Sequence, residues 1–403
     1  MTIVSDEVMQ YPFGKENELD VDPYYRELQR QGPIKIQMAF GPPCWLATRY
    51  DDVRTIFCDR RFSRLLPAGT EAPGAWHGAG AIDATVPLGM DPPRHTGVRR
   101  ITSPLFSVKR IRAMAERIQQ LVDELLDGMV EPGPGADFVG AYAWDLPINV
   151  LTALLGVPGA DANRFRGWVE TVTAMETGEE ERTASNQHLV DYIGELIAER
   201  RAHRHDDLLA HLVAARDDGE HLSEVELLGL VMSLIVGGFE TTATQLGSTV
   251  YTLMAHPEHW RELVDGRAEL KPALDELWRW IPAFRYGTMF VRWAKEDIEL
   301  SDGVVIRAGE AILPEQSIAN RDEAVFPHGW ELDFHRVDPL PHLALGFGEH
   351  LCMGFHLAKI QVELTVATLL RRFPTLALAI PPADVEWPAW TFMRTVGELP
   401  LTW

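Results

Sequence analysis

The chain has 403 residues, of which 46% are hydrophobic and 24% charged, so it has the composition of an ordinary globular protein with a large buried core. Its formal net charge of −22 repels phosphate backbones and anionic lipid, which argues against nucleic-acid or membrane-surface partners. The first thirty residues are polar and acid-rich, without the basic and apolar regions of a signal peptide, and no window reaches about 18 apolar residues. We therefore expect a cytoplasmic protein without a membrane anchor.

The first predicted elements are short strands at 34–38 and 45–48, on either side of a turn that contains Gly41-Pro42-Pro43. Helical spacing of apolar residues follows at 107–127 and 186–202. The histidines between 203 and 211 lack metal-ligand spacing and indicate a solvated junction between a helix and a loop. A hairpin is predicted at 297–313, turned at Asp302-Gly303, and a last strand pair at 375–403.

Between the first strands and these helices stands Asp91-Pro-Pro-Arg-His-Thr-Gly-Val-Arg-Arg100. His95 and Arg99 are four residues apart, so on a helix they share one face and can donate to the same acidic group. A pair of ordinary surface charges is the alternative.

A long helix is predicted from the capping box Ser223-x-x-Glu226 to His256, where Pro257 forbids further winding. Its middle carries Gly237-Gly238-Phe-Glu240-Thr241-Thr242. Two adjacent glycines cost a helix about 1 kcal/mol each, so we expect an unwound turn that leaves room for a ligand. Glu240 and Thr241 are suited to proton transfer there. The alternative is a kinked core helix on which Glu240 faces water.

Downstream, Glu276 and Arg279 are spaced to form a salt bridge on a helix opened by Pro272 and stopped by Pro282. Such pairs are also common on solvated helices.

Three cysteines, Cys44, Cys58 and Cys352, have no metal-ligand spacing, which argues against a disulfide framework or a structural zinc site. Cys352 alone stands in a special setting, Leu345-Gly-Phe-Gly-Glu-His-Leu-Cys-Met-Gly354. Glycines let this backbone curl tightly and approach a flat ligand, and the N-terminus of a following helix stabilises a thiolate. A glycine-rich turn that happens to hold a buried cysteine is the alternative.

The Cys352 segment resembles the haem-binding loop of the cytochrome P450 family, F-x-x-G-x-H/R-x-C-x-G, and the Gly237–Thr242 segment resembles its oxygen-activation motif. The resemblance implies that Cys352 is the axial ligand of a haem iron, and that Glu240 and Thr241 deliver protons. Leu345 stands where the family usually has Phe. We interpret this as a conservative apolar change that affects the redox potential of the iron and does not remove the site. Further expected haem contacts are His95, Arg99, Arg292, His350, Leu345, Gly346, Phe347, Gly348, Gly354, Gly237 and Gly238. Of these, His95, Arg99, Arg292 and His350 are expected to bind the propionates.

The same resemblance makes Arg336 a third member of the Glu276–Arg279 set, with a structural role in fixing the loop that delivers Cys352. It also implies the fold: a single mostly α domain over residues 1–403, a prism around a buried haem, with β-rich portions at about 30–60, 285–315 and 375–403. The expected pocket residues are mainly apolar, namely Leu88, Val236, Thr288, Met289, Phe290, Phe392 and Met393, with Trp76 and Tyr286 as aromatic additions.

We therefore expect a monomeric monooxygenase with haem b that activates dioxygen and hydroxylates an apolar or aromatic small molecule of specialised metabolism. No flavin or iron–sulfur segment is recognised, so electrons are expected from NAD(P)H through a ferredoxin and its reductase. Two alternatives stay open. One is oxidative coupling or ring closure without oxygen insertion, and the other is a haem-thiolate sensor or binding protein without turnover.

Overall fold

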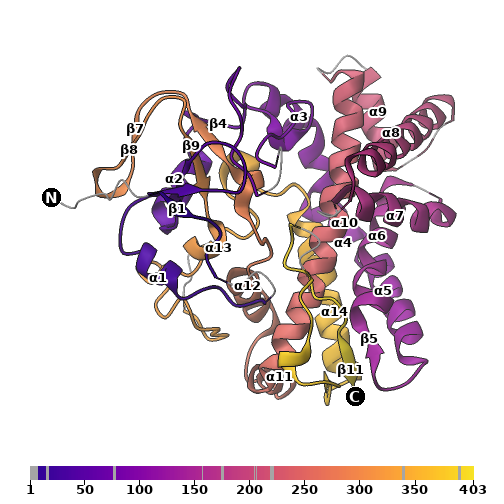
Figure 1. The fold of residues 1–403 in the computed structure, drawn as a ribbon. Coiled ribbons are helices and arrows are strands. Elements are labelled where there is room, and N and C mark those ends of the chain that lie inside the picture. Colours follow the sequence, from indigo (N-terminus) through magenta and orange to yellow (C-terminus); the bar gives the residue numbers. More distant parts are fainter. Residues whose placement is uncertain are drawn as a thin grey trace. The chain divides into compact units, whose positions relative to one another are not determined.

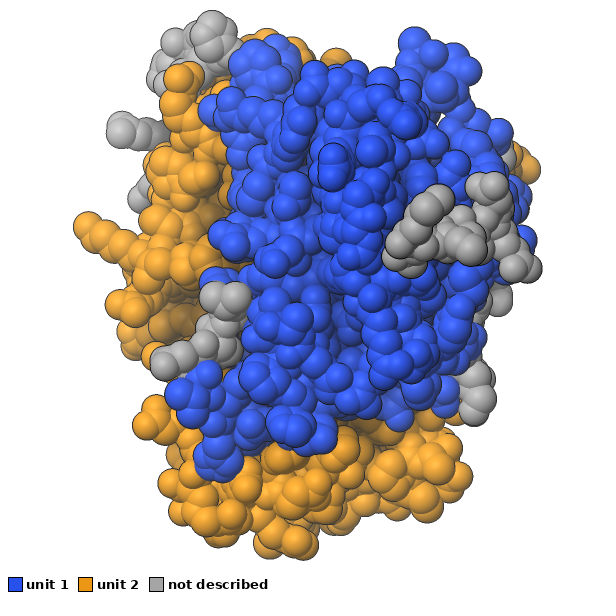
Figure 2. All heavy atoms as spheres, turned by 90° about the vertical axis from the view of Figure 1, so that its left-hand side faces the viewer, with its two compact units in different colours: residues 1–96, 275–352 blue, residues 97–274, 353–403 orange. Residues whose placement is uncertain are grey.

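A computed structural model describes residues 8–14, 18–75, 79–156, 158–173, 177–203, 205, 207–217, 222–337, 341–388 and 392–403. The chain divides into two compact units, which Figure 2 colours blue and orange. Unit 1 comprises residues 1–96 and 275–352, and unit 2 comprises residues 97–274 and 353–403. Helices dominate the described residues and the sheets are small, so the predicted mostly α class is confirmed. The single-domain expectation stays a prediction.

Unit 1 holds a six-stranded sheet in the order β1-β2-β3-β9-β6-β4. The inner strands β3 and β9 are parallel neighbours and are buried at every position, which explains why their sequences are almost continuously apolar. The strands of this sheet are β1 (Met9–Gln10), β2 (Ile34–Gln37), β3 (Cys44–Ala47), β4 (Phe62–Ser63), β6 (Arg292–Ala294) and β9 (Ala311–Pro314).

The predicted hairpin at 297–313 is shorter than expected. Strands β7 (Ile298–Glu299) and β8 (Val305–Ile306) pair antiparallel across a turn in which Asp302 has φ 55° and Gly303 has φ 72°. The last residues of the predicted range belong instead to β9, which pairs with β3 and β6 in the larger sheet.

One apolar cluster forms the core of unit 1 and reaches the segments that matter for function. It includes buried side chains from the sheet and from α2 (Tyr50–Cys58), together with Phe326 and Leu343. Phe290 and Phe347 pack against this cluster while remaining partly exposed. The core thus anchors both the segment around Phe347 and the segment around Phe290. The other helices of unit 1 are α1 (Tyr24–Leu28), α13 (Gln316–Ala319) and most of α12 (Leu270–Trp280).

Unit 2 is built around α10 (Glu224–Ala255), which packs against α6, α8 and α14 (Figure 1). Its other helices are α4 (Val108–Ala113), α5 (Ala115–Val130), α6 (Asp145–Leu155), α7 (Ala162–Thr173), α8 (Glu179–Ala202), α9 (Leu208–Asp217), α11 (Pro257–Val264), α14 (Phe355–Arg372) and most of α3 (Arg94–Thr102). A three-stranded sheet joins β10 (Ala377–Leu378) and β11 (Pro400–Thr402), as predicted, to β5 (Ala136–Asp137), which was not predicted.

Short 3-10 or π-helical turns complete the described elements. They are η1 (Pro87–Gly89), η2 (Ser103–Phe106), η3 (Val139–Ala143), η4 (Gly159–Asp161), η5 (Gly287–Phe290), η6 (Ser301–Gly303), η7 (Gly348–His350) and η8 (Pro382–Asp384).

The predicted bounds of the long helix are confirmed. The hydroxyl of Ser223 accepts from the Glu226 amide, and the Glu226 carboxylate accepts from the Ser223 amide, so the capping box is complete. The unwound turn at Gly237-Gly238 is wrong, because α10 is helical through both glycines. Among the described helices, α10 is long and apolar enough to span a membrane, but 56% of its apolar window is buried, as in the core helix of a globular protein.

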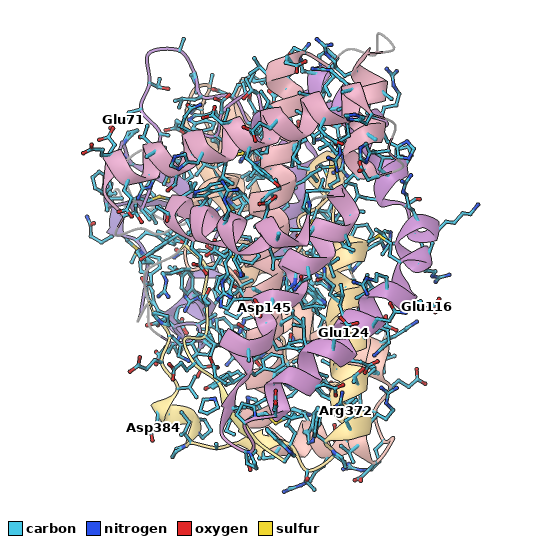
Figure 3. The ribbon with its side chains drawn as sticks, turned by 90° about the vertical axis from the view of Figure 1, so that its right-hand side faces the viewer. Glu71, Glu116, Glu124, Asp145, Arg372 and Asp384 are labelled. Atoms are coloured by element: carbon cyan, nitrogen blue, oxygen red, sulfur yellow. The ribbon has the colours of Figure 1, made fainter. Side chains whose placement is uncertain are left out.

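Ion pairs tie the C-terminal end of α14 to α5. Arg372 donates to Asp127 at 2.6 Å and lies 3.9 Å from Asp123. Figure 3 labels Arg372 at the end of α14 and Glu124 on α5. Within the same pair of helices, Gln119 donates to the Thr368 hydroxyl at 3.0 Å. These contacts fix the helix that begins three residues after Cys352.

Candidate functional site

The segment that carries Cys352 is a tight loop at the end of unit 1. The Cys352 amide donates to the Leu345 carbonyl at 2.8 Å, and the Gly346 amide donates to the Leu343 carbonyl at 2.9 Å. Gly346 and Gly348 have φ of +75° and +67°, values that favour glycine. The predicted tight curl of this backbone is confirmed, and the loop presents Cys352 half-buried.

Packing against α2 holds this loop in place. A Cβ on Gly348 would lie 3.0 Å from the Phe57 carbonyl oxygen and 3.2 Å from the Cys58 sulfur, and φ is +67°, so any other residue would be strained there. The Phe347 ring packs on the core cluster of unit 1, and the Arg54 guanidinium lies 5.2 Å from its centroid.

The other two cysteines lack the features of Cys352. Cys44 is buried in β3, and burial raises the pKa of its thiol to about 12. Cys58 is the last residue of α2 and is exposed overall, but partial desolvation of its sulfur by neighbouring groups still raises the pKa of its thiol. A cysteine binds a metal as its thiolate, and Cys352 alone stands in a tightly curled loop just before the N-terminus of a long helix, so it is the best candidate of the three.

His95 and His350 come together in unit 1, although 255 positions separate them in the sequence. Their rings stack with centroids 4.0 Å apart and an interplanar angle of 29°. His95 is buried on α3, and its amide donates to the Asp91 carbonyl at 3.0 Å. Two stacked imidazoles offer N–H donors to one acidic group, which fits the role predicted for both. Arg99, on the same helix, is half-buried in unit 2.

Arg292 is buried in β6 with 2% of its surface exposed. Its guanidinium donates to the Phe290 carbonyl at 2.8 Å and lies 5.7 Å from the Phe57 ring centroid. Burial, and then the nearby Arg64 cation, hold its pKa well below the usual range. Within the described part of the chain, no carboxylate lies within ion-pair distance of this guanidinium. A buried cation in this setting calls for an anionic partner.

Arg64 is a buried residue at this site that was not predicted. Its side chain donates to three backbone carbonyls, those of Leu88, Met289 and Val291. Burial lowers its pKa to about 9, while Asp91 acts in the opposite direction. No sequence motif marked Arg64, because two of its three carbonyl partners lie more than 200 positions away in the sequence.

These residues of unit 1 fit the carboxylate edge of a haem. Arg64 and Arg292 place two positive charges in the interior, and Asp91 is the carboxylate beside them. One carboxylate does not balance two buried guanidinium groups, and the His95–His350 stack adds further donors. A propionate bound at Arg292 would supply the missing negative charge, whereas the Arg64 side chain donates to backbone carbonyls. The tightly curled loop presents Cys352 half-buried, as an axial ligand of the macrocycle requires.

Glu276, Arg279 and Arg336 meet in unit 1 and are nearly inaccessible to solvent. Glu276 receives two hydrogen bonds of 2.7 Å from Arg279, and two of 3.1 and 3.2 Å from Arg336. Arg279 also donates to the carbonyls of Asn320, Gly329 and Glu331.

The same set leads toward the Cys352 loop. The side-chain oxygen of Asn320 accepts from the Leu343 amide at 2.6 Å, and Leu343 in turn accepts from Gly346. Hydrogen bonds therefore run from α12 to the loop, which supports the structural role predicted for the set.

In unit 2, α10 presents the Glu240 segment. Glu240 is 1% exposed, so the alternative in which it faces water is wrong. The Thr241 hydroxyl donates to the Gly237 carbonyl one turn earlier. A Cβ on Gly237 would meet nothing within 4 Å, whereas one on Gly238 would lie 3.1 Å from Leu151 of α6. Gly354, the N-cap of α14, also has open space around its Cβ direction.

The expected pocket residues fall into three groups. Half-buried side chains belong to Leu88, Met289 and Phe290 in unit 1 and to Val236 and Phe392 in unit 2. Met393 and Tyr286 are buried, with 0% and 5% exposed, which favours a packing role for them. Trp76 and the side chain of Thr288 lie outside the described residues.

The histidines between 203 and 211 show no metal geometry. His205 lies 2.7 Å from a carboxylate oxygen of Glu199, and His203 lies 3.7 Å from the same atom. Across the described residues, no group of three or more His, Cys, Asp or Glu side chains is arranged to hold a metal ion.

Residues 139–388 match the family described as Cytochrome P450. The nocardicin C N-oxygenase of Nocardia uniformis subsp. tsuyamanensis is 40% identical over 396 residues, 98% of either chain. The mycinamicin IV hydroxylase/epoxidase of Micromonospora griseorubida is 40% identical over the whole of both chains. The solved structure of cytochrome P450mel 107F1, described as having biaryl coupling reactivity, is 37% identical with a TM-score of 0.92, covering 98% of this chain and 100% of that chain.

Proposed function

This chain belongs to the cytochrome P450 family and is an oxidoreductase of that family, and we propose that it hydroxylates an apolar or aromatic small molecule. The observation that carries the proposal is the loop that presents Cys352, closed by its hydrogen bond to Leu345 and built on two glycines of positive φ. Members of this family contain haem and receive electrons from redox partners.

When bound, a haem with a thiolate ligand supplies the activation of dioxygen. Cys352 would hold its iron, and His95, His350 and Arg292 would hold its propionates. Arg99 and the glycines at 237, 238, 346, 348 and 354 are the remaining proposed contacts. The haem is proposed to be haem b.

Glu240 and Thr241 are proposed to move protons. The buried carboxyl of Glu240 can exchange a proton with water inside unit 2. The Thr241 hydroxyl donates its hydrogen bond to the Gly237 carbonyl, so its oxygen can accept a hydrogen bond from such a water. Glu240 would exchange protons with this water and Thr241 would position it, so that the water carries protons toward the reacting oxygen.

The substrate is proposed to be a specialised metabolite with an apolar or aromatic portion. Support comes from the apolar, half-buried side chains of Leu88, Met289, Phe290, Val236 and Phe392. The relatives named above act on nocardicin C and on mycinamicin IV, which are natural products. We further propose a cytoplasmic monomer that takes electrons from NAD(P)H through a ferredoxin and its reductase.

Oxidative coupling or ring closure is the second candidate reaction. It is favoured by the structural relative with biaryl coupling reactivity, which matches 98% of this chain. The two reactions differ in the fate of oxygen, because coupling leaves both oxygen atoms in water whereas hydroxylation transfers one to the product.

A spin-shift screen tests the proposal. Candidate natural products are added to the haem-loaded protein, and binding near the iron is expected to shift the Soret band. Ligands that give the shift are then turned over with a surrogate ferredoxin, its reductase and ¹⁸O-labelled dioxygen. One labelled oxygen atom in the product supports hydroxylation. Coupled product without label would favour the second candidate, and bound ligands that are never oxidised would count against both.

A further inference from the structure

Arg64 joins two segments of unit 1 that are distant in sequence. Its Nε donates to the Leu88 carbonyl at 2.6 Å, its Nη1 to the Val291 carbonyl at 2.8 Å, and its Nη2 to the Met289 carbonyl at 2.6 Å. Leu88 lies in η1, and Met289 lies in η5 just before β6. The planar guanidinium has donors in fixed directions, so arginine can hold three acceptors at once, whereas lysine is a point charge on a flexible stem.

The backbone of Arg64 is itself fixed. Asp91 accepts from the Arg64 amide at 2.9 Å and from the Ser63 hydroxyl at 2.5 Å, and it pairs with Lys295 at 3.1 Å. Strand β4, which ends at Ser63, pairs with β6. Arg64 therefore projects from an anchored position and determines where the η1 and η5 carbonyls lie.

Burying the Arg64 guanidinium costs free energy, which is unexpected for a side chain whose only role is packing. The side chain is 2% exposed, and its hydrogen-bond acceptors are carbonyl groups rather than a carboxylate. Asp91 is close but binds the Arg64 amide, and a buried guanidinium that donates to no carboxylate is unfavourable unless its hydrogen bonds are needed. Two of the three carbonyls belong to Leu88 and Met289, and the side chains of these two residues are apolar and half-buried.

We propose that Arg64 is a positioning residue that holds η1 against η5 and so fixes an apolar wall of the substrate pocket. The inference rests on the proposed function, because that function assigns Leu88 and Met289 to the pocket. Arg64 touches neither substrate nor haem in this role. Arg64 should therefore affect the binding of ligands with an apolar ring that reaches this wall, and not of ligands that occupy only the space nearest the iron.

Two azoles of different size test this role. Imidazole and 4-phenylimidazole both bind ferric haem through a ring nitrogen and shift the Soret band, but only the phenyl group reaches a pocket wall. The variants are Arg64→Lys, Arg64→Met and, as a matched control, Arg61→Lys, an exposed arginine on the other side of the short strand β4. We expect both Arg64 variants to weaken 4-phenylimidazole binding about tenfold and to change imidazole binding less than about twofold. The control should match the parent protein for both azoles.

Hydrogen–deuterium exchange gives a second readout that does not depend on ligand. In Arg64→Lys, exchange should rise within 86–90 and 287–291 and stay unchanged in β7 and β8. Equal weakening of both azoles, unchanged binding of both, or full retention by Arg64→Lys would overturn the proposal. Failure of both Arg64 variants to take up haem would also overturn it, because Arg64 would then serve folding. A parent protein without a Soret band would instead mean that the proposed function has failed.

Discussion

Cys352 differs from the other two cysteines in the backbone that carries it. Its amide is tied to Leu345, and two glycines of positive φ precede it. We predict that Cys352→Ser abolishes the thiolate-type carbon monoxide spectrum of the reduced protein, because a serine hydroxyl does not replace a thiolate as ligand. Cys58→Ser is the control and should keep the spectrum. A thiolate-type spectrum in the Cys352 variant would refute the assignment.

The Glu276 carboxylate balances two buried guanidinium groups. Its side chain is 5% exposed, and those of Arg279 and Arg336 are 2% and 7% exposed. We predict that Glu276→Gln lowers the free energy of unfolding by about 3–5 kcal/mol, because two buried cations lose their counterion. Urea denaturation of the haem-loaded protein measures this loss.

The matched control for Glu276 is an exposed ion pair. Arg267 lies 3.2 Å from Asp265, with about half of each side chain in solvent. Arg267→Gln should change stability by no more than about 0.5 kcal/mol. Equal, small effects of the two substitutions would contradict a structural role for the Glu276 set.

At the scale of the helix, the two glycines in α10 should respond differently to the same change. Gly237→Ala adds a methyl group in open space, so the helix should gain about 0.5–1 kcal/mol of stability. Gly238→Ala should gain less, because its methyl group would lie 3.1 Å from Leu151. Urea denaturation of both variants compares them.

Ligand affinity, measured on the same Gly237 variant, tests whether this glycine also has a function. If Gly237 leaves room for a ligand, Gly237→Ala should lower substrate affinity while stabilising the protein. A variant that is more stable and binds ligand as well as the parent would show that the space beside Gly237 has no such use.

Local signals predicted some elements well and others poorly. The capping box and Pro257 fixed both ends of α10, because these interactions act within a few residues. The two-glycine cost suggested an unwound turn, but contacts of α10 with α6, α8 and α14 keep the helix intact. The position of β9 between β3 and β6, and the pairing of β5 with β11, depend on distant partners and had no local signal.

In the candidate site too, some residues have a local sequence signal and others depend on distant partners. Cys352, Glu240 and the Glu276 set carry recognisable spacing, so they could be found in the sequence. Arg64 could not, because its partners Leu88 and Met289 become neighbours only in the folded unit. The stacking of His95 on His350 is likewise a product of the fold, although each residue was a candidate alone.

For the whole molecule, titratable groups predict how stability depends on pH. Hydrogen bonds from Arg61 lower the pKa of Asp59, and the Ala308 amide and Arg307 lower that of Asp297. Burial raises the pKa of Asp91, but hydrogen bonds from Arg64, Ser63 and Lys295 outweigh it and leave the pKa lowered. Stability from these carboxylates is present above their unfolded pKa values of about 4 and is lost as pH falls through the folded values.

His356 adds a step at higher pH. Burial, and then the cations Lys359 and Arg112, lower its pKa. The unfolded chain therefore binds a proton first as pH falls below about 6.5, and the folded state loses stability from that point. We predict a small fall in Tm between about pH 7 and pH 5.5 and a larger one below about pH 4. His356→Gln should remove the first fall and leave the second. A Tm that stays constant down to about pH 3.5 would contradict both steps, because His356 and the three carboxylates all make the unfolded state bind more protons in acid.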